Sequence, residues 1–100
     1  MLKIMIKRSV PAEREKEVLA LITQLRTQAT QQAGYVSGET LRSPEEPGQI
    51  LVISIWEDDK DWQRWVESDA RKELQARIDA IAWAETVYER YMSSGMPHAD

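Results

Sequence analysis

The sequence predicts an α+β domain in which strands and helices follow one another in the order β-α-β-β-α-β. Residues 2–7 alternate between branched aliphatic and other side chains, with the period of a half-buried strand. Residues 50–55 (ILVISI) are almost wholly apolar and rich in β-branched side chains, as in a strand inside a sheet. Residues 18–29 and 62–66 carry apolar side chains at helical spacing.

The first helix is expected to follow Pro11, whose missing N–H is not needed in a first helical turn. Its apolar stripe consists of Val18, Leu21, Ile22, Leu25 and Ala29. The remaining positions are mostly charged or polar, which predicts a solvated outer face. Gly34 is expected to end this helix, in the position just after the C-cap.

The second half of the chain predicts two strands, a helix in two pieces and a last strand. The prolines and glycine of residues 43–49 (SPEEPGQ) predict a connecting turn between the two strands. The helix is expected to begin near Asp59 with a capping aspartate, and Ser68 predicts a break with a fresh cap. Residues 83–92 return to a strand-like pattern, and residues 93–100 are expected to form a flexible tail.

Residues 1–92 are therefore expected to form one domain on the ferredoxin-like plan, a four-stranded antiparallel sheet with helices on one face. A single helical layer leaves the other face of the sheet open. The apolar strand at 50–55 needs cover on both faces. We therefore expect a homodimer in which two sheets pack face to face.

The composition argues against several classes of function. The chain lacks cysteine, and its single histidine is His98, so we expect no disulfide and no metal site. A net charge of -4 and a pI near 5.0 argue against a nucleic-acid partner. No apolar run reaches the roughly 20 residues that span a bilayer, and the N-terminus does not resemble a signal peptide. We expect a cytoplasmic protein with no membrane partner.

Three short motifs point to a family. They are Gly34-Tyr35 followed by Ser37-Gly38-Glu39, then Ile55-Trp56-Glu57, and finally Trp62-x-x-Trp65-x-x-Ser68. With these motifs, residues 2–92 resemble the antibiotic biosynthesis monooxygenase (ABM) family of dimeric α+β barrels. The resemblance implies a homodimer with a pocket in each subunit between the sheet and the broken helix. It also implies oxidation of a quinol- or anthrone-like aromatic molecule by dioxygen, with no cofactor.

Two alternatives to this activity stay open. One is a non-catalytic dimeric module that binds a small apolar ligand. The other is a divergent relative of a haem-degrading branch, which has a Trp on the broken helix, a haem-ligating His ten positions later and an Asn near the end of the first strand. Trp65 matches the Trp, but Gln75 stands at the His position and Arg8 at the Asn position. We therefore expect no haem bound through a histidine.

Four residues are candidates for substrate binding: Arg8, Tyr35, Trp65 and Gln75. Strand parity turns Arg8 towards the helices, where it is expected to attract an anionic or phenolate substrate or to pair with a carboxylate. The resemblance implies that Trp65 faces the pocket, whereas Trp62 is interpreted as core. Tyr35 is expected to donate a hydrogen bond to substrate or to pack, and Gln75 is expected to face solvent unless it joins the pocket. The sequence identifies no catalytic residue.

Overall fold

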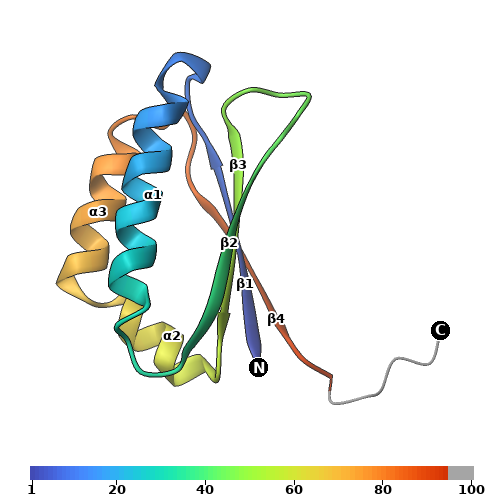
Figure 1. Ribbon diagram of the computed structural model, residues 1–100, viewed down its shortest axis with the longest axis vertical. Coiled ribbons are helices and arrows are strands. Elements are labelled where there is room, and N and C mark those ends of the chain that lie inside the picture. The colour runs from blue at the N-terminus through green and yellow to red at the C-terminus, as the bar shows by residue number, and fades with distance from the viewer. Residues whose placement is uncertain (95–100) are drawn as a thin grey trace.

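Two layers make up the fold, a four-stranded antiparallel sheet and three α-helices on one of its faces (Figure 1). The computed structural model describes residues 1–94, a range in which no helix is long and apolar enough to cross a membrane. In chain order the elements are β1 (Leu2–Ser9), the 3-10 helix η1 (Ala12–Arg14), α1 (Glu15–Ala29), β2 (Tyr35–Arg42), β3 (Gln49–Trp56), α2 (Asp59–Val66), α3 (Asp69–Asp79) and β4 (Val87–Met92). His98 and most of the predicted tail lie outside the described residues.

The sheet has the strand order β2-β3-β1-β4, which is the order of the ferredoxin-like plan. The predicted fold class is therefore confirmed, including a second helix broken into α2 and α3. In Figure 1, α1 and α3 lie side by side along the sheet, and α2 crosses near the end where β2 begins and β3 ends.

Both faces of β3 are apolar, as the sequence predicts, but helices cover only one of them. The residues on the helix side are buried: Ile50, Val52, Ser54 and Trp56. The residues on the other side are only half-buried: Leu51, Ile53 and Ile55. In β1, which pairs with β3, every second residue from Leu2 to Arg8 is buried towards the helices. In the described part of the chain, no helix lies on the open face (Figure 1).

The first helix carries the predicted stripe, but it ends earlier than the sequence suggested. All five stripe residues are buried, and α1 ends at Ala29 with Thr30 as its C-cap. The expectation that Gly34 ends α1 is therefore wrong. Gly34 has a φ of 84° and opens β2 instead, because positive φ also suits a tight entry to a strand. A Cβ atom at this position would collide with the side chain of Asp61 on α2.

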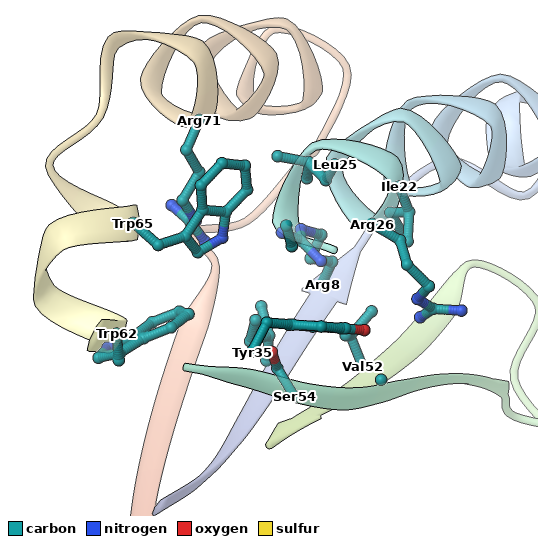
Figure 2. Close-up of a pocket in the computed structure, with 13 residues that line it drawn as sticks. Arg8, Ile22, Leu25, Arg26, Tyr35, Val52, Ser54, Trp62, Trp65 and Arg71 are labelled. Atoms are coloured by element: carbon teal, nitrogen blue, oxygen red, sulfur yellow. The ribbon is translucent and has the colours of Figure 1, made fainter. Parts of the chain in front are cut away.

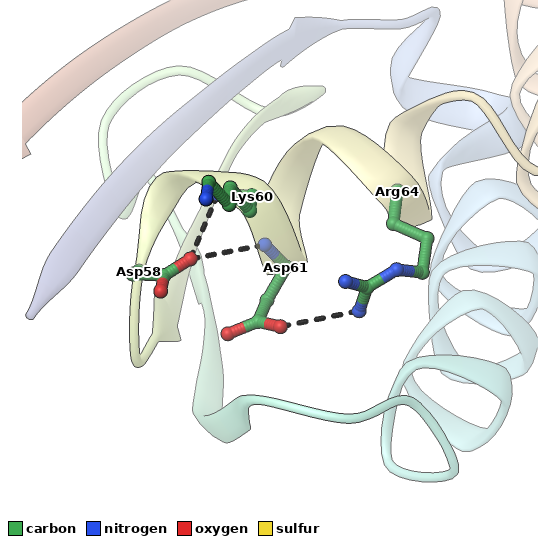
Figure 3. Close-up of polar contacts among 4 residues, drawn as sticks. All are labelled: Asp58, Lys60, Asp61 and Arg64. Carbon is green, nitrogen blue, oxygen red and sulfur yellow. Dashed lines mark hydrogen bonds and ion pairs between the residues drawn. The ribbon is translucent and has the colours of Figure 1, made fainter.

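Polar side chains define both parts of the broken helix. The Asp58 carboxylate accepts hydrogen bonds from the backbone N–H groups of Lys60 (2.8 Å) and Asp61 (3.3 Å), which caps α2 (Figure 3). Ser68 Oγ accepts a hydrogen bond from the N–H of Arg71 (3.3 Å) and donates one to the carbonyl of Trp65 (2.7 Å). Ser68 therefore ends α2 and caps α3 at once, as the sequence predicts.

A buried carboxylate ties the start of α1 to the turn between β2 and β3. Glu15 is 6% exposed, accepts a hydrogen bond from the N–H of Gly48 (2.7 Å) and pairs with Arg42. The Gly48 carbonyl in turn accepts a hydrogen bond from the N–H of Val10 (2.9 Å). The Gly48 N–H, and after it the Arg42 guanidinium, hold the pKa of Glu15 below its ordinary value because both favour the ionised carboxylate.

The Glu15 contacts predict a stability that depends on pH. A carboxylate with a lowered folded-state pKa stabilises the fold above its unfolded pKa of 4.5, and the contribution is lost as pH falls through the folded-state pKa. In Glu15→Gln, we expect a smaller free energy of unfolding at neutral pH. As pH falls below 4.5, that free energy should decrease less steeply than in the parent protein. Urea unfolding at a series of pH values measures both. The exposed Glu45→Gln is the control, and parallel pH curves for Glu15→Gln and the parent would contradict the prediction.

Candidate functional site

A small cavity lies between the helix side of the sheet and the three helices (Figure 2). Its volume is about 40 Å³, which is room for a few water molecules. Three sheet strands and all three α-helices contribute to its wall, so the cavity exists only in the assembled fold. The lining residues used below are Arg8 from β1, Arg26 from α1, Tyr35 from β2, Trp62 and Trp65 from α2 and Arg71 from α3.

Aromatic rings form much of the wall, and Trp56 holds them in place. The Trp56 ring packs edge-on against Tyr35, with 5.3 Å between centroids, and stacks with Trp65 at 6.5 Å. Trp62 also packs edge-on against Trp56 at 6.0 Å. The Trp56 indole N–H donates to Ser54 Oγ (2.8 Å), which fixes this fully buried ring. Trp62 therefore belongs to the core, as interpreted from the sequence, and lines the cavity as well.

Arg8 brings a buried positive charge to this cavity. Its side chain is on the helix side, as strand parity predicts, and the residue is 2% exposed. Nη2 donates a hydrogen bond to Gln75 Oε1 (2.7 Å), whereas Nε has no partner among the described residues. Burial, and to a lesser degree the charge of Arg71, lowers the pKa of Arg8 to about 10, so the guanidinium stays charged at neutral pH. The expected ion pair with a carboxylate is not formed in the described part of the chain.

Gln75 lies behind Arg8, outside the cavity wall. It is 8% exposed, and its Nε2 donates to Asp79 Oδ1 (2.8 Å) and to Thr86 Oγ1 (3.0 Å). The expectation that Gln75 faces solvent is wrong, because its amide is the buried partner that the Arg8 guanidinium requires. Its other side borders an open groove of about 640 Å³, which Trp83 and Tyr88 also line. The amide of Gln75 therefore positions Arg8.

Two cavity residues escaped the sequence analysis, Arg71 and Arg26. Arg71 is 5% exposed, donates to the hydroxyl of Tyr88 (2.9 Å) and lies 5.4 Å from the ring centroids of both Trp62 and Tyr88. Arg26 is half-buried and donates to Thr40 Oγ1 on β2 (2.5 Å). Arg26 lies four residues after Ile22 of the apolar stripe, a spacing that points it to the same face. Arg71 lies three residues before Leu74 and seven before Ile78, a helical spacing that likewise points it to the buried face of α3.

A family model described as antibiotic biosynthesis monooxygenase matches residues 1–77. The chain belongs to the antibiotic biosynthesis monooxygenase family. The resemblance seen in the three sequence motifs is thereby confirmed, and the cavity lies where that resemblance implies a pocket. Its lining includes Arg8, Tyr35 and Trp65 but not Gln75. Contact between any of these residues and a substrate stays a prediction, as does the absence of histidine-bound haem.

Solved structures share the ABM fold at low sequence identity. The cofactor-independent oxygenase SnoaB from Streptomyces nogalater has a TM-score of 0.85 and 13% identity, covering 95% of this chain and 94% of its own. A conserved protein from Methanosarcina mazei Go1 has a TM-score of 0.84 and 20% identity, covering 90% and 89%. An antibiotic biosynthesis monooxygenase matches with a TM-score of 0.84 and 18% identity, covering 93% and 98%. No curated protein sequence matches the chain.

The Arg8–Gln75 hydrogen bond predicts the effect of Gln75→Leu on stability. This change leaves the buried guanidinium without its partner, and we expect the free energy of unfolding to fall by about 2 kcal/mol, as for other hydrogen bonds to charged groups. Gln24→Leu, on the exposed face of α1, is the control and should change it by less than about 0.5 kcal/mol. Urea unfolding measures both variants. Equal losses in the two would show that the Arg8–Gln75 bond contributes little.

Proposed function

We propose that this protein is an ABM-type monooxygenase that uses dioxygen, without a cofactor, to oxidise a small quinol- or anthrone-like aromatic molecule. The observation that carries the proposal is the cavity itself. The rings of Tyr35, Trp62 and Trp65 suit a flat aromatic substrate, and the Arg8 guanidinium suits an anionic oxygen on it. The description of the similar structure SnoaB as a cofactor-independent oxygenase supports the same reaction class.

The chemistry requires little from the protein beyond this environment. A phenolate or enolate is electron-rich enough to pass an electron to dioxygen directly, whereas the neutral phenol is not. Arg8 favours the ionised form, and the aromatic wall excludes bulk water from the reactive intermediate. One atom of dioxygen enters the ring carbon or methylene carbon, and the other leaves as water. For a quinol the product is a hydroxyquinone, and for an anthrone it is an anthraquinone.

The cavity has to open to admit any aromatic ring, and a single ring requires less opening than a polycyclic one. At about 40 Å³ the cavity is much smaller than typical ligand pockets, which are on the order of 300 Å³ or more. A polycyclic anthrone therefore needs substantial opening. The same small volume favours the alternative of a non-catalytic dimeric module that binds a small apolar ligand.

Oxygen uptake separates the two functions. With a panel of quinols and anthrones, we expect the parent protein to consume oxygen. Arg8→Ala should slow uptake by about 100-fold, the usual effect of losing one donor to an oxyanion. Trp65→Phe should also slow uptake, while its melting temperature falls only modestly because most of the apolar volume remains.

The exposed Trp83→Phe is the control for general effects of losing an indole, and it should leave uptake unchanged. No uptake with any substrate, together with a large loss of stability in Arg8→Ala and Trp65→Phe, would exclude the catalytic function. The ligand-binding module would then be the better description.

We also propose that the protein is a homodimer with its two sheets packed face to face. The open face of the sheet carries a continuous apolar strip along β3, formed by Leu51, Ile53 and Ile55. On the neighbouring strands Met5 and Leu41 extend the strip, whereas Lys3 and Lys7 of β1 separate it from Val87 and Tyr91 of β4. An apolar sheet face of this kind is typically covered in stable proteins.

Light scattering at micromolar concentration should give about twice the chain mass of 11.5 kDa. The interface is expected to be of at least standard size, roughly 1,600 Å² in total. Ile53→Lys places a charge in the middle of the strip and should give a folded monomer. Thr23→Lys, on the exposed side of α1, is the control and should stay dimeric. A parent protein that is monomeric under these conditions would contradict the proposal.

A further inference from the structure

Seven of the eight arginines of this chain fall into two groups by the charge of their partners, and Arg77, in the last turn of α3, belongs to neither group. The first group lies at the surface and pairs with carboxylates: Arg14, Arg42, Arg64 and Arg90. The second group lines the cavity, and its hydrogen-bond partners are all neutral. Arg8 donates to the amide of Gln75, Arg26 to the hydroxyl of Thr40 and Arg71 to the hydroxyl of Tyr88.

No carboxylate among the described residues balances these charges inside the cavity. Its described wall contains three guanidinium groups and no Asp or Glu, although the whole chain has a net charge of -4. Asp79 lies outside the cavity wall and is hydrogen-bonded to Gln75, although its charge still favours the charged form of Arg8. Arg8 Nε, buried and without a partner in the described part of the chain, is a free donor at this site. Buried charges are ordinarily paired, so the arrangement lacks an anion.

We infer that the cavity binds a small aromatic molecule that carries a carboxylate, held between the guanidinium groups of Arg8 and Arg71. This inference rests on the proposed function, because it names the substrate class of the same site. A phenolate alone balances one of the three positive charges, whereas a carboxylate together with a phenolate balances two. A carboxylate also matches the planar fork of donors on a guanidinium.

The surroundings favour an aromatic acid over an inorganic anion. Tyr35, Trp62 and Trp65 offer flat apolar surface beside the charges, as Figure 2 shows, and an inorganic ion would leave this surface unused. At about 40 Å³ the cavity has to widen to admit a ring, and the half-buried wall residues Arg26 and Tyr35 mark the side on which it can open. The substrate class assigned is therefore a single-ring hydroxylated benzoate.

The first test compares ligands on the parent protein by titration calorimetry. The probes are 2,5-dihydroxybenzoate, the neutral 2,5-dihydroxybenzamide and inorganic phosphate. The benzoate should bind at least about 30-fold more tightly than the amide, because the amide leaves buried charges unpaired. It should also bind more tightly than phosphate, which cannot use the aromatic wall. Equal affinity for benzoate and amide, or tighter binding of phosphate, would overturn the inference.

The second test removes single charges. Arg71→Gln should weaken binding of 2,5-dihydroxybenzoate by at least about 30-fold and leave the amide nearly unaffected. Arg64→Gln removes the same charge from the surface, where Arg64 pairs with Asp61 (3.2 Å) (Figure 3), and should leave binding unchanged. Equal effects of the two changes would show that net charge alone is responsible and would overturn the inference. If Arg71→Gln does not fold, the comparison of the three ligands on the parent protein tests the inference by itself.

Oxygen uptake with the same ligands separates this inference from the proposed activity. Selective binding of the benzoate without oxygen uptake supports the charge assignment and contradicts the monooxygenase. Uptake that is equally efficient with the benzoate and the amide supports the monooxygenase and contradicts the charge assignment. Uptake confined to the benzoate supports both.

Discussion

A charged guanidinium, that of Arg8, is buried between the sheet and α3, and its need for a hydrogen-bond partner constrains how α3 packs on the sheet. Arg8 comes from the central strand β1, and its one hydrogen-bond partner among the described residues is the amide of Gln75. The amide is itself held by Asp79 and Thr86, so its oxygen has to face Arg8. Because a buried charge without a partner is costly, the packing of α3 on the sheet depends on this chain of hydrogen bonds.

The aromatic cluster and the arginines form one unit around the cavity. Trp56 fixes the rings of Tyr35, Trp62 and Trp65, and Arg71 lies against Trp62. Positive charge is therefore held close to flat apolar surface, away from the carboxylates that dominate the outside of this acidic chain. In such a place an electrostatic interaction is stronger than in water. The site is thus suited to aromatic anions, which connects the fold to its proposed chemistry.

The fold was predictable because its signals are local. The alternation in β1, the stripe of α1 and the caps at Asp58 and Ser68 each depend on residues only a few positions apart. The error at Gly34 has the same local origin. A glycine with positive φ can end a helix or open a strand, and only the packing of Asp61 against it shows which.

The sequence by itself determined the order of the elements, the inward direction of Arg8 and the apolar open face of β3. Each follows from a period of two or 3.6 residues, which short-range geometry imposes. Tertiary structure alone decided that Gln75 bonds to Arg8, that the side chains of Arg26 and Arg71 line the same cavity as that of Arg8, and that this cavity is small. The spacing within α3 indicates which side of that helix is buried but not which residues of β1 it meets, and side chains from six elements set the volume of the cavity. Both depend on packing between residues far apart in the chain, which no local pattern encodes.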